Sequence, residues 1–459
     1  MIFEERQIEK NNFSVRVTLL FGLMIFGLIA VLLQVFSLQT SGYTNYQLAA
    51  LNNKNYAVPV QSLRGEIFDR NGKTLIKNKP TYDLITRPNL IDDINSFLEK
   101  IQPVIFLSEN EISNYKKLQK EKAFVNKELV LKKDLSPEEI ARFNVRSFNF
   151  QNAFIAQRYR RISDYPEIFS HVLGYTSRIE NDSESMPEIP ESHWKDTELV
   201  YAHGLIQGQT GLEQIYDDHL SGQHGQRVYE MNARGQFVQP LSFTQPAKGS
   251  DLYTNLDIDA QKSAAKFLGN RKGAVVAIDL ESGGINVLYS SPTYSINELS
   301  NGMSENNFQT LLNDADKPFF NRALQGRYPP ASTIKPAIGM YGLSNSIVNW
   351  DFEIKDPGFF TLPETGRVFR GWQKGGHGKV NMHKAFLVSS NTYFFSLAYQ
   401  ADIEELSNHL SSLGFGQKVC LDCFEEDPAF VPTPEWKYSI MNAGWVKGDT
   451  VNLGVGQGD

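Results

Sequence analysis

Ser332 and Lys335 are the first residues whose types and spacing indicate chemistry, in the stretch PPASTIKP at 329–336. A serine hydroxyl becomes a good nucleophile when a positioned base removes its proton. A lysine amine can be that base where burial lowers its pKa. The two prolines favour the start of a helix, so we predict Ser332 in a first helical turn, with Lys335 on the same face. The spacing thus permits a Ser–Lys dyad.

The spacing alone does not identify the dyad, because Ser-x-x-Lys occurs elsewhere in the sequence. The other matches are Ser113/Lys116, Ser192/Lys195 and Ser263/Lys266. A surface serine in a polar turn therefore remains an open interpretation of Ser332 at this point.

Ser389 and Asn391 form a second candidate group, in VSSNTYFF at 388–395. Ser389 could relay a proton between Lys335 and a leaving group, and Asn391 could hydrogen-bond the lysine or a substrate amide. The alternative is that Ser389 or Asn391 caps the apolar helix that follows, as both residue types commonly do.

The sequence on the N-terminal side of Ser332 predicts the helix and strands that must position these groups. The stretch 259–269 predicts a helix that starts near Asp259, and 273–291 predicts two buried strands around a Glu-Ser-Gly-Gly turn. A strand pair beside helices indicates an α+β domain with a sheet as its platform.

The region before this domain contains sequence patterns of both strands and helices. Alternating apolar residues and the Asn71-Gly72 turn predict a β-hairpin. Residues 90–145 have helical spacing and predict a small helical subdomain, and 204–226 predicts a loop, an amphipathic helix and a turn. We expect structural ion pairs and turn contacts that link this region to the next domain, made by Arg64, Asp69, Arg70 and Glu213. A direct role of these residues in binding a partner is the alternative.

Residues 17–38 form an uncharged apolar stretch long enough to cross a bilayer. Arg6, Lys10 and Arg16 precede it, which places residues 1–16 in the cytoplasm. A cleaved signal peptide is the alternative, but its apolar core would be shorter and followed by a small-x-small cleavage site. We predict an uncleaved anchor, with the bulk of the chain outside the cytoplasmic membrane.

Composition and cysteine content indicate the general class of the protein and the state of its cysteines. The 459 residues are 41% hydrophobic and 21% charged, with a net charge of −7, which is typical of globular proteins and argues against nucleic-acid binding. Cys420 and Cys423 are the two cysteines. Outside the cytoplasm a local disulfide is favoured over a zinc half-site.

The motifs together resemble a known family. YPPASTIKP and SSN are similar to the first two signature motifs of penicillin-binding proteins and serine β-lactamases. RGEIFDRNG at 64–72, TGLEQIYDDHLSG at 210–222 and NRALQGRYPPASTIKP at 321–336 resemble class B penicillin-binding proteins. GWQKGGHGKVN at 371–381 and GDTVNLGVGQG at 448–458 resemble the elongation-type penicillin-binding protein 2.

The resemblance implies a peptidoglycan D,D-transpeptidase of the inner membrane that faces the periplasm, cross-links stem peptides during cell elongation and is trapped by β-lactams. Ser332 would attack D-Ala-D-Ala and form an acyl-enzyme. Lys335 would be the base, Ser389 the proton shuttle and Asn391 the residue that orients the substrate. No cofactor is implied. The implied partners are a SEDS-family glycosyltransferase and other membrane proteins of the elongation complex.

The implied organisation is a cytoplasmic tail at 1–16, an anchor at 17–38, an elongated, mostly-β non-catalytic pedestal with a small helical subdomain at 39–255, and a transpeptidase domain at 256–459. The third family motif, Lys-Ser/Thr-Gly, does not follow Ser389. We therefore expect an incomplete penicillin-binding/β-lactamase-like transpeptidase domain. As a chain of 459 residues it would be nearly inactive and poorly stable.

A second departure concerns a metal that some relatives hold near the site with two Asp, a His and a Cys. Asp356 and His377 match two of these positions, but Gly371 and Ser390 occupy the others. Two ligands make a poor site, so we predict no zinc. The alternatives to this enzyme are a division-type paralogue, a β-lactamase or β-lactam sensor, and a catalytically dead membrane scaffold that retains its partners.

Overall fold

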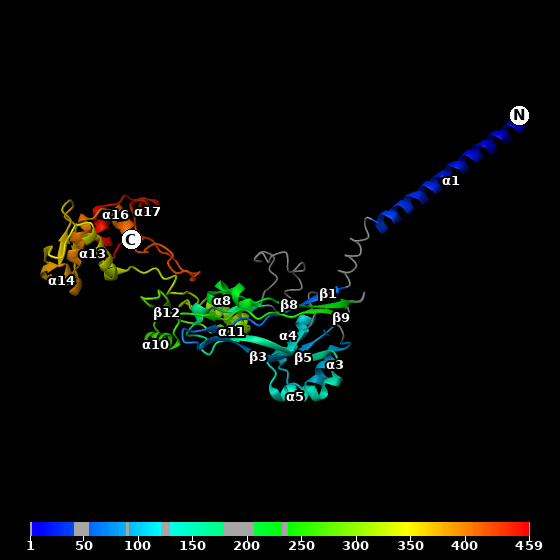
Figure 1. Cartoon of the computed structure of the whole chain (residues 1–459), viewed down its shortest axis with the longest axis horizontal. Helices are drawn as coiled ribbons and strands as arrows, with labels where there is room; N and C mark the ends of the chain where they lie inside the picture. The colour runs from blue at the N-terminus through cyan, green and yellow to red at the C-terminus, as the bar shows by residue number, and fades with distance from the viewer. Residues whose placement is uncertain are drawn as a thin grey trace.

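The polypeptide runs from a long N-terminal helix through a β-rich middle region to a helix-rich C-terminal region (Figure 1). The computed structural model describes residues 2–40, 55–88, 91–120, 129–178, 206–231 and 237–458. The N-terminal helix and the C-terminal region lie at opposite ends of the long dimension of the molecule. The mixture of helices and sheets confirms the predicted α+β class.

Helix α1 spans Ile2–Thr40 and contains the apolar segment Leu19–Ser37. All side chains of that 19-residue segment are exposed. A helix of this length and composition can cross the hydrocarbon core of a bilayer. The helix predicted at 17–38 is therefore present, while its place in a membrane stays a prediction.

The main sheet of the middle region is built around strand β3, Thr74–Thr86. Its other strands are β2 (Ile67–Phe68), β4 (Leu129–Lys132) and β5 (Ala153–Ile162), antiparallel to β3, and β10 (Leu252–Tyr253), parallel to β2. The predicted hairpin is confirmed, because β2 and β3 pair around a turn in which Gly72 has a φ of +77°. Glycine adopts that conformation without steric cost.

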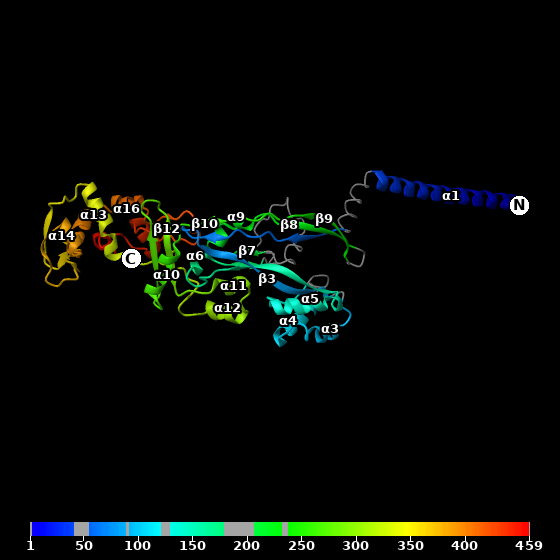
Figure 2. The ribbon, with the colours of Figure 1, turned by 60° about the horizontal axis from the view of Figure 1, so that its bottom comes forward.

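A second sheet has the strand order β1–β8–β9 and lies beside the main sheet (Figure 2). Its antiparallel strands are β1 (Asn55–Val60), β8 (Gly225–Met231) and β9 (Phe237–Thr244). Together the two sheets make the middle region long and mostly β, as the sequence predicts for the pedestal.

The helical subdomain predicted at 90–145 is present over its described residues. Its elements are α3 (Ile94–Ile101), α4 (Glu109–Lys120), α5 (Pro137–Arg146) and the 3₁₀ turn η3 (Ser147–Asn149). Ser136 and Glu139 form a capping box that fixes the start of α5. The helices bury Leu98, Tyr115 and Phe143 in a core that they share with strands β3, β4 and β5.

The amphipathic helix predicted within 204–226 is two short helices. These are α8 (Gly211–Ile215) and α9 (Asp217–Ser221), which follow α6 (Ser170–Leu173) and the strand pair β6 (Thr176–Arg178) and β7 (Ile206–Gly208). The single-helix prediction was wrong because Tyr216, between them, leaves the helical conformation with φ −102° and ψ +25°.

Glu213 on α8 lies at the centre of a buried ionic cluster. Its carboxylate accepts hydrogen bonds from Arg64 at 2.6 Å and from Arg161 at 2.7 Å. All three side chains are at most 3% exposed. Burial alone would raise the pKa of Glu213, but the charges of Arg161 and Arg64 outweigh it and hold the pKa below its usual value. The prediction that Arg64 and Glu213 make structural ion pairs is confirmed, since they pair with each other, and Arg161 is a further partner of Glu213.

The C-terminal region begins with α10 (Ile258–Leu268), capped by Asp257, close to the start predicted at Asp259. Its strands β11 (Gly273–Ile278) and β12 (Ile285–Ser291) pair antiparallel. The prediction that both strands are buried was wrong for β11, where Val276 is 46% and Ile278 55% exposed. Apolar β-branched residues predict a strand, but a neighbouring element must cover them before they are buried.

The remaining elements follow further along the chain. The helices are α11 (Ile296–Asn301), α12 (Glu305–Leu312), η4 (Ala331–Ile334), α13 (Lys335–Ser344), α14 (Met382–Leu387), α15 (Asn391–Gln400), α16 (Ile403–Ser412), α17 (Pro434–Met441) and α18 (Lys447–Leu453). The strand pairs are β13 (Glu353–Asp356) with β16 (Gly378–Asn381), and β14 (Phe359–Thr361) with β15 (Val368–Arg370).

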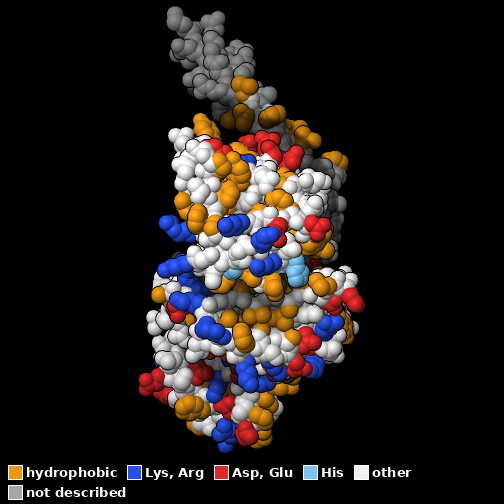
Figure 3. Space-filling model, turned by 90° about the vertical axis from the view of Figure 1, so that its left-hand side faces the viewer, with side chains coloured by type: hydrophobic (Ala, Val, Ile, Leu, Met, Phe, Trp, Pro, Cys, Tyr) orange, Lys and Arg blue, Asp and Glu red, His pale blue; other side chains and the backbone are white. Residues whose placement is uncertain are grey.

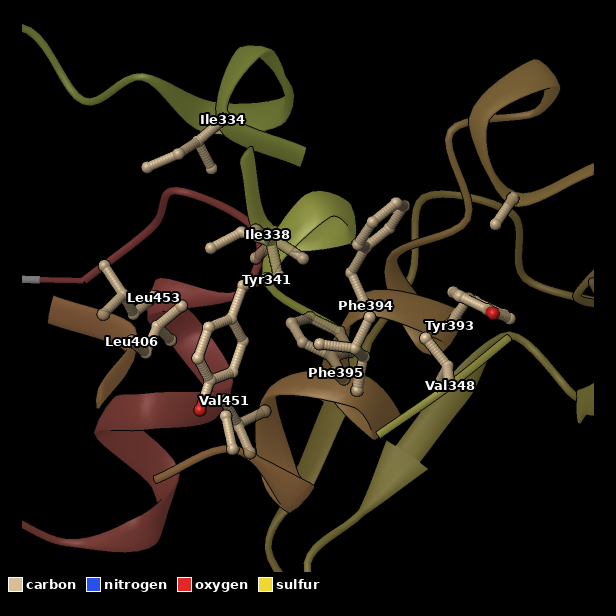
Figure 4. Close-up of a cluster of buried hydrophobic side chains, with 14 of the residues drawn as sticks. Ile334, Ile338, Tyr341, Val348, Tyr393, Phe394, Phe395, Leu406, Val451 and Leu453 are labelled. Atoms are coloured by element: carbon tan, nitrogen blue, oxygen red, sulfur yellow. The ribbon is translucent and has the colours of Figure 1, made fainter. Parts of the chain in front are cut away.

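A hydrophobic core joins α13 and α15, the two helices that begin at Lys335 and Asn391 (Figure 4). Ile338 and Tyr341 of α13 pack with Phe394 of α15, and α16 and α18 close the core from the other side. Ile338 and Phe394 are fully buried. Close packing of this kind resists small displacements, so the first turns of α13 and α15 are held in a fixed relative position.

The segment 414–433 carries the disulfide Cys420–Cys423, which the sequence favours over zinc. Asp422 between the two cysteines accepts a hydrogen bond of 2.9 Å from Tyr216 of the middle region. Among the residues that the structure describes, Cys420, Asp422 and Cys423 are the one group of three possible metal ligands. Its two sulfurs are already bonded to each other.

Candidate active site

Ser332 lies in the 3₁₀ turn η4, immediately before α13. The sequence predicts it in the first turn of an α-helix, whereas the α-helix begins three residues later, at Lys335. Pro330 precedes the turn, and Ala331 has a φ of +48°. The Ser332 side chain is exposed. It belongs to the C-terminal region, at the end of the molecule opposite α1, and Figure 3 views the molecule from that end.

Lys335 is 2% exposed, and its amine has three hydrogen-bond acceptors. Nζ donates to the backbone oxygen of Ser389 at 3.1 Å, to Ser389 Oγ at 3.0 Å and to Asn391 Oδ1 at 2.7 Å. It also lies 5.3 Å from the centre of the Phe394 ring. All three acceptors are uncharged, and burial lowers the pKa of Lys335 to about 8. With that pKa, about one lysine in ten is neutral at pH 7 and able to accept a proton.

Ser389 connects Lys335 to Ser332. Its hydroxyl, which accepts from Lys335, donates to Ser332 Oγ at 3.2 Å. The three groups therefore form a continuous hydrogen-bonded chain from a buried amine to an exposed hydroxyl. The structure brings all four predicted residues, Ser332, Lys335, Ser389 and Asn391, into one site.

Ser390, which the resemblance placed only at a metal-ligand position of some relatives, caps α15. Its hydroxyl accepts from the backbone N–H of Tyr393 at 3.3 Å. The alternative that Ser389 or Asn391 is the cap was therefore wrong, and both side chains are turned to Lys335 instead. The signal for Ser390 was available, because serine immediately before an apolar helix is a preferred N-cap.

Asp356 lies behind this turn and is 3% exposed. One carboxylate oxygen accepts from Ser390 Oγ at 2.7 Å and the other from Gly358 N–H at 2.7 Å. Burial would raise the pKa of Asp356, but these hydrogen bonds outweigh it and lower the pKa. Both oxygens are thus engaged within the protein. The absence of zinc stays a prediction.

The loop 371–377 touches the site from another side. Trp372 is 63% exposed, and its ring nitrogen donates to the backbone oxygen of Val388 at 3.1 Å. Its ring packs against His377, whose backbone oxygen accepts from Lys384. These contacts connect the loop to the turn that carries Ser389.

Gly456 supports the turn of Ser332, a contact that the sequence analysis did not find. Its backbone oxygen accepts from Ala331 N–H at 3.0 Å, and it has a φ of +62°. A Cβ atom at this position would lie 2.4 Å from the Ala331 oxygen. Glycine is therefore required where the segment after α18 passes close to the turn.

Comparisons with known proteins agree with this geometry. Residues 59–254 match the penicillin-binding protein dimerisation domain, and residues 273–459 match the penicillin-binding protein transpeptidase domain. The peptidoglycan D,D-transpeptidase MrdA of Acinetobacter baumannii is 35% identical over 98% of this chain and 66% of its own length. MrdA of Haemophilus influenzae is 33% identical over 99% of this chain and 69% of its own length. The chain thus spans about two thirds of the length of these relatives.

A solved structure is also similar. It is a complex between penicillin-binding protein PBP2 and MreC from Helicobacter pylori, with a TM-score of 0.74 and 27% identity. The match covers 88% of this chain and 73% of that one.

Proposed function

Because this chain belongs to the family of penicillin-binding proteins that contains the MrdA peptidoglycan D,D-transpeptidases, we propose that it catalyses D,D-transpeptidation through an acyl-enzyme on Ser332. The observation that carries the proposal is the hydrogen-bonded chain from Lys335 through Ser389 to Ser332. It supplies a base, a relay and a nucleophile in contact with one another.

The first half of the proposed reaction acylates Ser332. Neutral Lys335 takes the hydroxyl proton by way of Ser389, and Ser332 Oγ forms a bond with the carbonyl carbon of the penultimate D-alanine of a stem peptide. The resulting oxyanion needs hydrogen-bond donors, one of which we assign to the backbone N–H of Ser332. The carbon–nitrogen bond then breaks, and the proton on Lys335 returns through Ser389 to the departing D-alanine amine.

The second half releases the acyl group. An amine of a neighbouring stem peptide attacks the ester carbon and gives its proton to Lys335. Ser332 leaves and recovers that proton, so the enzyme ends in its starting state. Asn391 is bound to Lys335 by its oxygen, which leaves its amide N–H groups available to orient the peptide.

The proposed setting is the outer face of the cytoplasmic membrane, with α1 as the anchor. Helix α1 and the middle region would contact a SEDS-family glycosyltransferase and other membrane proteins of the elongation complex. The similar Helicobacter pylori protein was solved in complex with MreC. A version with α1 replaced by a cleavable signal peptide should bind penicillin yet fail to maintain rod shape, and full maintenance of rod shape would contradict this role.

The test of the reaction is covalent labelling of the intact protein that contains these residues with a fluorescent penicillin. Ser332→Ala should abolish labelling, and Lys335→Ala should slow it by about 10²–10⁴-fold, the usual contribution of a general base. Ser263→Ala is the matched control, because Ser263 also precedes a lysine by three residues but lies on α10 and donates to the Asp259 backbone.

Mass spectrometry of the labelled peptide identifies the acylated serine. If Ser332→Ala is labelled at the parent rate, another serine is the nucleophile and the proposal is wrong. If the folded parent is not labelled at all, the chain is instead the non-catalytic scaffold.

A further inference from the structure

Ser389 occupies a conformation that its surroundings must impose. It has a φ of +50° in the short turn between α14 and α15. Residues other than glycine rarely adopt this left-handed backbone conformation, and it persists where neighbouring contacts hold it. The contacts of Ser389 with Lys335 and Ser332 both depend on this turn.

Ser390 is the buried anchor of the turn. It is 0% exposed, and it lies between the two residues that contact Lys335, namely Ser389 and Asn391. Its hydroxyl uses its proton toward Asp356 and one lone pair toward the N–H of Tyr393. A displacement of Ser390 would therefore move Ser389 and Asn391 together.

Asp356 accepts the hydrogen bond from Ser390 and is itself held in place by strand pairing. It ends β13, where it pairs with Gly378 of β16, the strand that leads into α14. Its second oxygen is held by the N–H of Gly358. A hydrogen bond to a carboxylate is shorter and stronger than one between neutral groups, and the contact of 2.7 Å joins residues 34 positions apart in the sequence.

Lys335 is held by Ser389 and Asn391, while the contacts of Asp356 are with Ser390 and Gly358. Burial is the one cause that lowers the pKa of Lys335. The hydrogen-bonded link from Asp356 to the residues that hold Lys335 therefore runs through Ser390 and the shape of the turn.

We propose that Asp356 and Ser390 are positioning residues for acylation, and that their hydrogen bond holds Ser389 and Asn391 on Lys335. This inference rests on the proposed function, because it concerns the same reaction. The competing interpretation is that Ser390 is an ordinary helix cap and Asp356 a stabilising partner, with no effect on the chemistry beyond overall stability.

The experiment compares Asp356→Ala, Asp356→Asn and Ser390→Ala with a matched cap variant, Ser304→Ala. Ser304 caps α12 through a hydrogen bond of 3.3 Å, the length of the cap bond of Ser390, and it lies outside the site. The intact protein is mixed with a penicillin, and stopped-flow measurements separate the acylation rate constant from the dissociation constant of the non-covalent complex. Thermal midpoints are recorded for each variant.

We expect Asp356→Ala and Ser390→Ala to lower the acylation rate constant by about 10²-fold, the loss that a misplacement of about 1 Å can cause. Non-covalent binding should change much less. Asp356→Asn keeps the shape and one acceptor oxygen, so its loss should be smaller. Ser304→Ala should lower the thermal midpoint with no change in acylation. Hydrogen exchange should increase at residues 386–393 in the Ser390 and Asp356 variants.

The inference is overturned if the parent is acylated at Ser332 while Ser390→Ala and Asp356→Asn both acylate at the parent rate. It is also overturned if Ser304→Ala, at an equal fall in thermal midpoint, loses as much rate. If Asp356→Ala does not fold, the other two variants decide. If the Ser332→Ala variant is labelled as well as the parent, the proposed function itself is refuted, and this inference with it.

Discussion

Two buried cationic sites in this protein have opposite designs. In the middle region, Arg64 and Arg161 surround the carboxylate of Glu213, and all three are almost fully buried. In the C-terminal region, Lys335 is equally buried, but its three acceptors are uncharged. The first cluster keeps its charges because each has an opposite charge beside it. In the second site, burial lowers the pKa of Lys335, and its acceptors supply no opposite charge to offset that effect.

The difference shows that a buried cationic group can stabilise the structure or act as a base, depending on whether an opposite charge lies beside it. A buried ion pair whose members compensate one another stays ionised over a wide pH range and contributes to structure. A buried amine without a counter-charge becomes a base near neutral pH. Exchanging the two designs should therefore exchange their effects.

The largest effect is expected where the ion pair is broken. Glu213→Gln keeps the shape of the side chain but removes the carboxylate that Arg64 and Arg161 share. Arg161 then loses its ion pair, while Arg64 keeps Asp217 at 2.7 Å. Removing one partner of a buried ion pair costs about 3–5 kcal/mol. Urea unfolding of the middle region should show that loss. Glu66→Gln is the milder control, because the charge of Glu66 acts on Arg161 more weakly than that of Glu213 does. An unchanged free energy of unfolding would contradict the central role of Glu213.

The reverse change supplies the missing counter-charge at the other site. Asn391→Asp would place a carboxylate where Asn391 Oδ1 now lies, 2.7 Å from Lys335 Nζ. An opposite charge at this range raises a lysine pKa by about 1–3 units. Less Lys335 is then neutral at pH 7, so acylation there should fall by about 10-fold or more and recover at higher pH.

Asn391→Ala is the control for this exchange. It removes the same amide without adding a charge, so it should slow acylation without moving the pH profile upward. The comparison of the two profiles between pH 6 and 10 separates the loss of the amide from the gain of the charge. If Asn391→Asp has the profile of Asn391→Ala, the uncharged surroundings of Lys335 do not set its pKa.

The parent protein should already show the pH dependence of a lysine base. The pKa of Lys335 is about 8, and only the neutral amine accepts a proton. Acylation should therefore be slow in acid and increase about 10-fold between pH 7 and pH 9. A flat profile through this range would show that a different group, or no group, acts as the base.

The smallest effect is expected at exposed pairs. Lys73 and Asp259 are 2.7 Å apart, but both are more than half exposed. Solvent and salt screen such a pair, so Lys73→Ala should leave the thermal midpoint unchanged within error and should not affect acylation. A clear loss of stability would mean that this contact between the middle and C-terminal regions does more than its exposure suggests.

The sequence was sufficient for residues that lie in local motifs and insufficient for contacts between distant segments. Ser332 and Lys335 are three residues apart, and Ser389 and Asn391 are two apart, so each pair is visible in one stretch. The contact of Asp356 with Ser390 depends on the pairing of β13 with β16. No local pattern encodes that pairing.

The ionic cluster shows the same limit. Arg64 and Glu213 stood out in their motifs, but Arg161 lies in the strand segment RYRRI, where three arginines in four residues suggest a solvent-exposed face. The side chain instead turns inward to Glu213. The exposure of β11 and the break at Tyr216 were missed for a related reason, since both depend on which neighbours the folded chain provides.

The contact of Gly456 with the turn of Ser332 has a consequence in time. Ala331 donates to an oxygen that lies 125 residues further along the chain. At synthesis rates of about 5–20 residues per second, this partner appears roughly 6–25 s after the turn itself. The proposed nucleophile is therefore made long before its support, and a nascent chain has the serine before the contact that holds its turn.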